Sequence, residues 1–230
     1  MSTGITQSQQ IISLLQASHI VPEVLPSVPG DLEGQLSLAY PTHTIIPGEH
    51  VPRVVSKDIP VVRFKPFQES SARPGDGKFS IMMIDPDLTH MNDRLSGQVR
   101  HWLQPGIVFS ADQDEPSAGG EGWWVGKVTE KAVTEYLDAH RYVFLLLRET
   151  ASSAPQATDF PSTQRTHAAS FPKENENLAD RMGFNAAEYV EKKGLKVVGV
   201  TWMFVAPDLE SLVDNAKIGV ATVLDKVMGK

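Results

Sequence analysis

The sequence predicts a single, mainly β domain with helices at its periphery. Short apolar or alternating runs, bounded by Pro and Gly, recur along most of the chain and are typical of strands. Apolar residues with helical spacing occur only near the two ends and before the last expected strand. The 230 residues include no cysteine and 21% charged residues, which argues against a disulfide scaffold and a disordered chain.

Five segments have the pattern of strands. The first alternates polar and apolar residues, and the others are nearly continuous apolar runs that indicate burial. Residues 41–66, rich in Pro and Val, are expected to form short edge strands and turns, and residues 150–164 a polar linker. The run at 141–148 is the most apolar and is expected to be central in the sheet. The expected strands are Gln35–Tyr40, Phe79–Ile84, Arg100–Phe109, Arg141–Arg148 and Lys196–Val205.

Two helices are marked by their ends. Thr6 and Gln9 have the spacing of a capping box ahead of the first helix. Asn185 and Glu188 have the same spacing ahead of a second helix. Gly194 follows that helix where a C-cap glycine is expected.

A third helix is expected after the last strand, with its start capped by Asp208. Its apolar residues share one face, which packs on the domain or forms a dimer contact. We therefore divide the chain into one domain over residues 1–206 and a C-terminal amphipathic helix over residues 207–230. The apolar stripe comprises Leu209, Leu212, Val213, Ala216, Val220, Val223, Leu224 and Val227.

Composition excludes several classes of function. The formal net charge of −7 is a poor match for nucleic acid, so no nucleic-acid partner is expected. The longest apolar run, residues 143–147, is far shorter than the ~20 residues of a membrane-spanning helix, so no membrane insertion is expected. No basic residue precedes Arg53, which is unlike a secretory or transit signal, and we expect a cytoplasmic protein. Nucleotide-binding loops are also missing, and no cofactor is expected.

Polar side chains gather at the ends of three expected strands. An Asp-Pro-Asp turn follows the first strand, and a histidine lies inside the second. In the third, a histidine and a tyrosine two residues apart share a face. If these strands are neighbours, the site suits an anion, because imidazolium and phenol donate hydrogen bonds and the carboxylate orients the imidazole. The residues concerned are Asp85, Pro86, Asp87, His101, His140 and Tyr142.

Each of these groups also has a purely structural explanation. A lone histidine in an apolar strand is usually a satisfied core residue, and Asp-Pro-Asp is usually a turn. The imidazoles and carboxylates could also ligate a metal, but none has short-range ligand spacing, and no metal is expected. Trp123 and Trp124 follow a Gly-rich loop and either line a ligand site, contact a partner or pack in the core.

Four motifs, in this order, resemble signatures of the phosphatidylethanolamine-binding protein family. They are a strand running into D-P-D, an R-H-W before an apolar strand, an intact H-R-Y-V-F-L-L, and an R-x-x-F followed by G-L and a closing strand. The resemblance covers roughly residues 10–206 and looks most like fungal members. The motifs lie at residues 81–89, 97–103, 140–146, 181–184, 194–195 and 197–204.

The resemblance implies a central antiparallel sheet flanked by a smaller sheet and helices. It also implies one pocket, which in the family takes phosphate-like head groups. Asp85, His101, His140 and Tyr142 match the pocket positions of the family. Pro86 and Asp87, in the list above, match its supporting turn.

The chain departs from the family pattern in two places. The family's D-P-D-A-P ends here in Leu88 and Thr89. The family's Gly- and Pro-rich run, which forms one wall of the pocket, is replaced by the shorter segment Thr134–Ala139. The polar anchors are kept while a wall is changed, which indicates an anion pocket of a different shape.

The resemblance implies two kinds of function. One is binding of a phospholipid head group or inhibition of a serine carboxypeptidase. The other, which we favour because of the changed wall, is an accessory enzyme of fungal secondary metabolism that assists dimerisation of maleic-anhydride or dicarboxylate monomers in maleidride biosynthesis. The two pocket histidines, Asp85 and Tyr142 would then be the catalytic groups, and the tryptophan pair would shield the reaction from water.

Overall fold

The computed structural model describes residues 7–27, 29–30, 32–67, 77–87, 97–111, 122–136, 141–150, 152–160 and 181–206. Three expectations lie outside these residues: the cap at Thr6, the placement of His140 and the helix over residues 207–230.

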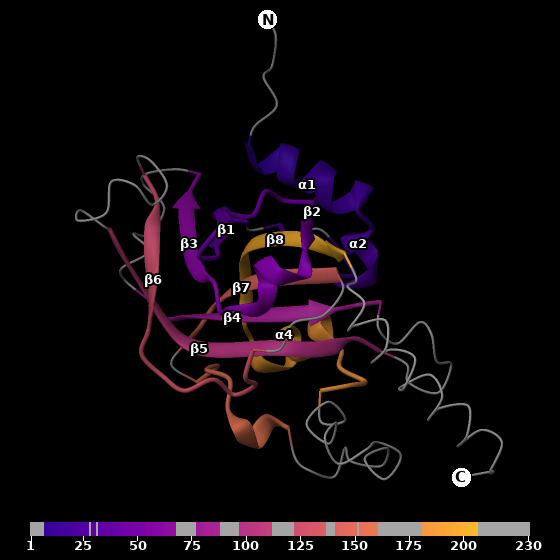
Figure 1. Cartoon of the computed structure of the whole chain (residues 1–230). Helices are drawn as coiled ribbons and strands as arrows, with labels where there is room; N and C mark the ends of the chain where they lie inside the picture. The colour runs from indigo at the N-terminus through magenta and orange to yellow at the C-terminus, as the bar shows by residue number, and fades with distance from the viewer. Residues whose placement is uncertain are drawn as a thin grey trace, which may run out of the picture.

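Eight strands form one sheet that curls on itself (Figure 1). Their order is β1-β3-β6-β5-β4-β7-β8-β2. Neighbouring strands are antiparallel, except that β2 runs parallel to β8 at one edge. The strands are β1 Gly34–Ala39, β2 Glu49–Pro52, β3 Val61–Pro66, β4 Phe79–Asp85, β5 Val99–Ala111, β6 Trp124–Val128, β7 Arg141–Arg148 and β8 Lys196–Ala206.

The described helices are short and peripheral. The N-cap predicted at Asn185 is present, because its Oδ1 accepts a hydrogen bond from the Glu188 backbone N–H at 3.1 Å. Gly194 ends the same helix with φ 65°, as a C-cap glycine does. Among the described residues no helix is long and apolar enough to cross a membrane. The α-helices are α1 Gln7–Ala17, α2 Ile20–Glu23 and α4 Ala186–Lys193, and the 3₁₀ helices are η1 Arg53–Lys57 and η3 Ala157–Asp159.

β5 is the strand around which the sheet turns. Residues 99–107 pair with β4, and residues 107–111 pair with β6. Pro105 and Gly106 lie at the change of partner, and Gly106 has φ 69°. A Cβ on Gly106 would also lie 2.5 Å from Glu130 Cγ, so glycine is required there. β1, β3 and β6 are therefore a flanking layer continuous with the central strands, at a steep angle to them (Figure 1).

Each face of the sheet carries a core. On the concave face, aromatic rings from the two halves meet, with the Phe109 ring centroid 5.8 Å from that of Phe64 and 5.1 Å from that of Phe79. On the outer face, α1, α2 and α4 cover a second cluster that includes Leu15, Leu145 and Tyr189. The central place predicted for residues 141–148 is confirmed, because β7 lies between β4 and β8.

Residues 152–160 belong to this packed domain and do not form the polar linker that we expected. They contain η3 and end at Phe160. The ring centroid of Phe160 lies 5.2 Å from that of Tyr189 and 6.1 Å from that of Phe184. Phe160, together with hydrogen bonds from Tyr189 and Lys193 to Asp159, therefore holds this stretch against α4.

Candidate functional site

Three of the predicted site residues lie together where β4 ends between β5 and β7. Asp85 is the last residue of β4 and pairs with Val99 of β5. On the other side, Ile84 pairs with Val143 of β7, so the antiparallel register sets Tyr142 opposite Asp85. His101 follows Val99 by two residues on β5. Residues from three segments of the chain therefore converge, as the sequence predicts.

A β-bulge directs His101 toward Tyr142. Ile84 pairs with Arg100 while Met83 pairs with Trp102, so His101 is the extra residue on β5. Its ring centroid lies 6.0 Å from that of Tyr142, with the rings tilted by 59°. The pair lies on the concave face of the sheet.

The cluster is buried. The exposed fraction is 1% for His101 and 0% for Asp85 and Tyr142. A ligand group bound by these side chains would be held away from bulk water, where hydrogen bonds and charges interact more strongly. We call Asp85, His101 and Tyr142 the inner cluster.

The Asp-Pro-Asp segment forms a local turn as well as contributing to the inner cluster. Asp85 Oδ1 accepts a hydrogen bond from the backbone N–H of Asp87 at 2.8 Å. This is the Asx-type bonding expected of an aspartate that follows a strand. Asp85 and Asp87 therefore hold the turn, with Pro86 between them buried.

Arg141 fixes this turn from outside. Its Nε lies 2.6 Å from Asp87 Oδ2, and its Nη2 donates to Asp87 Oδ1 at 2.9 Å. The same Nη2 donates to the carboxylate of Glu23 at the end of α2. Burial raises the pKa of Asp87, as does the neighbouring Asp85, while the guanidinium of Arg141 lowers it. Sequence reasoning missed this role of Arg141, although the residue stands inside the H-R-Y motif.

Arg181 supports His101 through the backbone. Its Nη1 donates to the carbonyl oxygen of His101 at 3.0 Å and to that of Glu135 at 2.7 Å. Burial lowers the pKa of the Arg181 guanidinium, and Glu135 opposes that shift. The R-x-x-F motif was the sequence signal for this arginine, but the motif alone does not reveal its contact with His101.

Thr134 is the first residue of the segment in which the sequence departs from the family pattern, and it is hydrogen-bonded to β5. The carbonyl oxygen of Thr134 accepts from the backbone N–H of Leu103 at 3.0 Å. Its hydroxyl oxygen accepts from Nε of Arg100 at 2.6 Å. Thr134 is thereby fixed to the strand that carries His101.

Tyr136 continues this wall. Its ring packs edge-on against Trp102, with centroids 5.6 Å apart and an interplanar angle of 80°. Its hydroxyl donates to the carbonyl oxygen of Ser56 at 2.6 Å and lies 3.0 Å from the hydroxyl of Tyr40. An anchored aromatic side chain therefore packs on Trp102, the residue that follows His101 in β5. Residues 137–140 lie outside the described structure.

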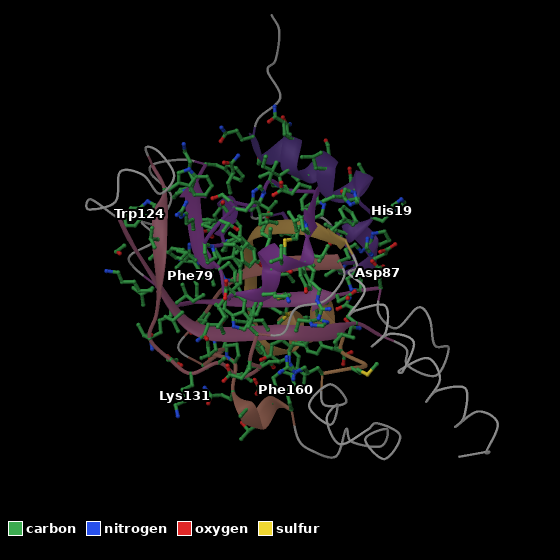
Figure 2. All side chains as sticks on the ribbon, in the orientation of Figure 1. His19, Phe79, Asp87, Trp124, Lys131 and Phe160 are labelled. Atoms are coloured by element: carbon green, nitrogen blue, oxygen red, sulfur yellow. The ribbon has the colours of Figure 1, made fainter. Side chains whose placement is uncertain are left out.

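The structure does not bring the tryptophan pair to the inner cluster. Trp124 pairs with Ala111 at the far end of β5, ten residues beyond His101 on a strand that rises about 3.3 Å per residue. Figure 2 shows Trp124 and Asp87 on opposite sides of the molecule. Trp124 is partly buried against the concave core, and Trp123 directly precedes it in the chain.

Within the described part of the chain, no three His, Asp or Glu side chains gather as a metal ion would require. The chemistry that the described cluster offers is therefore hydrogen-bond donation and proton exchange by an imidazole and a phenol beside a carboxylate.

Comparisons with known proteins agree with this arrangement. The sequence profile described as "Phosphatidylethanolamine-binding protein" matches residues 41–192, which is more than half of the chain. A search of curated protein sequences found no match.

Two solved structures share the fold. A carboxypeptidase Y inhibitor, solved in complex with its cognate proteinase, superposes with a TM-score of 0.65 at 16% identity, over 90% of this chain and 100% of the inhibitor. The phosphatidylethanolamine-binding protein of Plasmodium vivax superposes with a TM-score of 0.54 at 18% identity, over 86% of this chain and 97% of that protein. Identities this low show the fold alone. The profile match over residues 41–192, which covers more than half of the chain, shows that the chain belongs to the phosphatidylethanolamine-binding protein family.

Proposed function

We propose that this protein binds a small dianion through the inner cluster together with His140. The observation that carries the proposal is the burial of Asp85, His101 and Tyr142 side by side at the end of β4. An imidazole and a phenol both donate hydrogen bonds, and a carboxylate beside an imidazole orients its ring. His140 is two residues before Tyr142, the spacing of side chains on one face of a strand.

The dianion that we propose is a dicarboxylate, namely an alkyl-substituted maleate in equilibrium with its anhydride. The wall supports this choice. Tyr136 packs on Trp102 and is tied to Ser56, where the family carries a Gly- and Pro-rich run. An aromatic wall suits a flat, partly apolar dicarboxylate better than it suits a strongly hydrated phosphate head group.

The protein would use this pocket to assist the dimerisation of such monomers. His101 and His140 hold the carboxylate or anhydride oxygens as negative charge develops on them, which is where oriented donors lower a barrier most. One of the histidines serves as general acid or base, because an imidazole titrates near neutral pH. Asp85 orients the donors, and Tyr142 contributes its hydroxyl.

The test is a thermal-shift panel on the purified protein. Dimethylmaleate, phosphate and phosphoethanolamine are compared at equal concentrations and ionic strength. Dimethylmaleate is expected to raise the melting temperature most, because only a ligand that binds the native state stabilises it. Stabilisation by phosphate and phosphoethanolamine alone would favour the head-group function of the family and overturn the dicarboxylate proposal.

Three variants make this panel specific. Tyr142→Phe removes one oxygen atom from the inner cluster, and His140→Ala removes one of the proposed histidines. Each is expected to abolish the shift given by dimethylmaleate. His50→Ala is the matched control, because His50 is exposed and stacks on Phe204, outside the inner cluster. A shift that survives in both site variants would show that dimethylmaleate binds elsewhere.

Inhibition of a serine carboxypeptidase is a separate outcome. The superposition with the carboxypeptidase Y inhibitor covers that whole inhibitor, so a direct inhibition assay belongs in the same experiment. Inhibition that persists in Tyr142→Phe and His140→Ala, without any ligand-induced shift, would replace the proposed biosynthetic function.

A further inference from the structure

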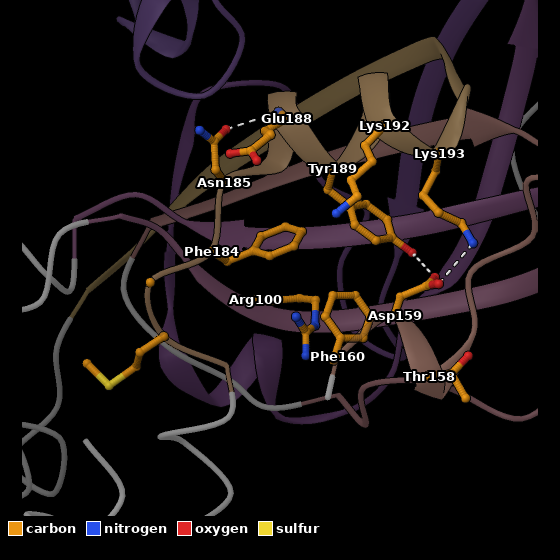
Figure 3. A pocket seen from close by; sticks show the side chains of 12 residues that line it. Arg100, Thr158, Asp159, Phe160, Phe184, Asn185, Glu188, Tyr189, Lys192 and Lys193 are labelled. Carbon is orange, nitrogen blue, oxygen red and sulfur yellow. Dashed lines mark hydrogen bonds and ion pairs between the residues drawn. The ribbon is translucent and has the colours of Figure 1, made fainter. Parts of the chain in front are cut away.

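A cavity lies on the outer face of the sheet, between α4 and residues 158–160 (Figure 3). Its volume is about 460 Å³, within the ~300–1,000 Å³ of small-molecule sites. Phe160 comes from the end of residues 152–160, Phe184 directly precedes the N-cap of α4, and Tyr189 lies in α4; the three rings form one aromatic wall. The Tyr189 ring centroid lies 5.2 Å from that of Phe160 and 5.5 Å from that of Phe184.

Arg100 lies beneath this aromatic wall. Its guanidinium carbon is 3.6 Å from the ring centroid of Phe160 and 5.1 Å from that of Phe184. Such cation–π contacts hold the rings in fixed positions. Arg100 is 4% exposed, so the buried end of the cavity carries a positive charge.

Asp159 is already engaged by its neighbours. Its Oδ2 accepts hydrogen bonds from the Tyr189 hydroxyl at 2.8 Å and the Gln156 backbone N–H at 2.9 Å, and its Oδ1 accepts from Lys193 Nζ at 3.0 Å. Two of these bonds are drawn in Figure 3. The charges of Asp159 and Lys193 therefore offset each other.

Lys192 supplies the unmatched charge. It is exposed at the rim of the cavity and makes no hydrogen bond or ion pair with any described residue. The lining has three cations, Arg100, Lys192 and Lys193, and two carboxylates, Asp159 and Glu188. Its net charge is thus +1, in a chain whose formal net charge is −7.

We propose that this cavity is a second binding site, for a small planar aromatic carboxylate. The aromatic ring of the ligand packs against the wall of Phe160, Phe184 and Tyr189, since aromatic rings favour offset or edge contacts with one another. Its carboxylate is directed to the ammonium of Lys192. The combination of an aromatic wall and one cation at the rim selects this chemistry over a neutral ring or an aliphatic acid.

The site is independent of the dianion pocket. Arg100 and His101 are consecutive on β5, yet Arg100 contacts the rings of the outer face while His101 faces Tyr142 on the concave face. Consecutive strand residues point to opposite faces, so this cavity and the inner cluster lie on opposite sides of one strand.

The experiment is a titration of the whole protein with 2-naphthoate, followed by amide chemical shifts and by calorimetry. 2-Naphthamide, which keeps the ring and lacks the charge, and acetate, which keeps the charge and lacks the ring, are the matched ligands. Shifts are expected at Phe160, Tyr189 and Lys192. The amide is expected to bind about three- to fivefold more weakly than the acid, the effect of losing one partly exposed ion pair.

Variants locate the site. Lys192→Gln is expected to weaken naphthoate binding by about the same three- to fivefold, while Lys127→Gln on β6, an equally exposed lysine, leaves it unchanged. Phe160→Leu tests the wall and is expected to weaken binding of both acid and amide by about two- to tenfold. If Phe160→Leu fails to fold, the proposal is still tested by comparing naphthoate with naphthamide and the parent protein with Lys192→Gln.

Several results would overturn the proposal. One is equal binding of naphthoate and naphthamide, and another is no binding of naphthoate at millimolar concentrations. A third is a loss of affinity in Lys127→Gln equal to that in Lys192→Gln. Shifts confined to the inner cluster, or binding abolished by Tyr142→Phe, would assign naphthoate to the dianion pocket. Naphthoate binding that is retained in Tyr142→Phe supports the second site even if dimethylmaleate does not bind.

Discussion

Arg141 Nε lies 2.6 Å from Asp87 Oδ2, and the same guanidinium donates to Glu23 at the end of α2. This contact joins the N-terminal helices to the turn that begins with Asp85. The turn is thus held by a side chain from β7 as well as by its own Asx bond.

Replacing Arg141 should loosen this connection. Arg141→Met is expected to lower the free energy of unfolding by about 2 kcal/mol, because two carboxylates lose their cation. The cost stays below that of a fully buried pair, since the side chains of Asp87 and Glu23 are 42% and 40% exposed. Urea denaturation measures the change, with the exposed Lys57→Met as control. A loss no larger than that of the control would show that the ion pairs do not stabilise the fold.

Asp159 should make stability depend on acid pH. Burial tends to raise the pKa of Asp159, but hydrogen bonds from Gln156, Lys193 and Tyr189 outweigh it and hold the pKa below its usual value. Because the folded-state pKa is depressed, the stabilisation is complete above the unfolded pKa, about 3.9, and is lost as the pH falls through the folded pKa.

Asp159→Asn is therefore expected to be less stable than the parent by roughly 1 kcal/mol at pH 7. The difference should shrink as the pH falls below the unfolded-state pKa and through the depressed folded-state pKa of Asp159, where the parent carboxylate is also protonated. Urea unfolding of both proteins at several pH values measures it. A difference that stays constant from pH 7 to pH 2 would rule out the carboxylate charge as its cause.

Gly97 should not tolerate a side chain. It has φ 111°, and a Cβ there would lie 2.9 Å from the backbone carbon of Gly183. Gly97→Ala is expected to cost about 2–4 kcal/mol, from backbone strain and from the clash beside the Gln98–Phe184 bridge. Gly30→Ala is the matched control, because a Cβ on Gly30 would have no atom within 4 Å of it. Equal melting temperatures for the two variants would contradict this account.

Tyr136 should influence which ligand the dianion pocket accepts. Tyr136→Phe removes the hydroxyl that donates to Ser56 and lies beside the Tyr40 hydroxyl. The expected loss is about 1 kcal/mol in the free energy of unfolding, together with a smaller thermal shift from dimethylmaleate, because the wall is no longer anchored. Tyr40→Phe serves as control, since it leaves the bond to Ser56 intact. An unchanged preference among dimethylmaleate and the phosphates in Tyr136→Phe would exclude Tyr136 from ligand selection.

Local patterns were sufficient to predict most of the strands. The run expected at Phe79–Ile84 is β4, and that expected at Lys196–Val205 is β8, each one residue longer than predicted. The N-cap at Asn185 could also be predicted from the sequence, because capping depends on residues only three positions apart. Strand periodicity also placed Asp85, His101 and Tyr142 at strand ends, on the condition that the strands are neighbours, and the family motifs matched the same residues.

The remaining features depend on partners that are distant in sequence. The bulge that directs His101 exists only because β4 pairs with both Arg100 and Trp102 around it. The contact between Arg141 and Glu23 spans 118 positions of the chain. Phe160 stands in a stretch that we expected to be a polar linker, and its packing depends on Phe184 and Tyr189, which are distant in sequence.

Because Arg100 and His101 are adjacent on β5 and face opposite sides of the sheet, the length of this strand is constrained in evolution. Inserting or deleting one residue in β5 ahead of them would turn the imidazole toward the aromatic wall and the guanidinium toward Tyr142. The inner cluster and the outer-face cavity would both be lost in a single event. Variation in β5 must therefore proceed by substitution at constant length.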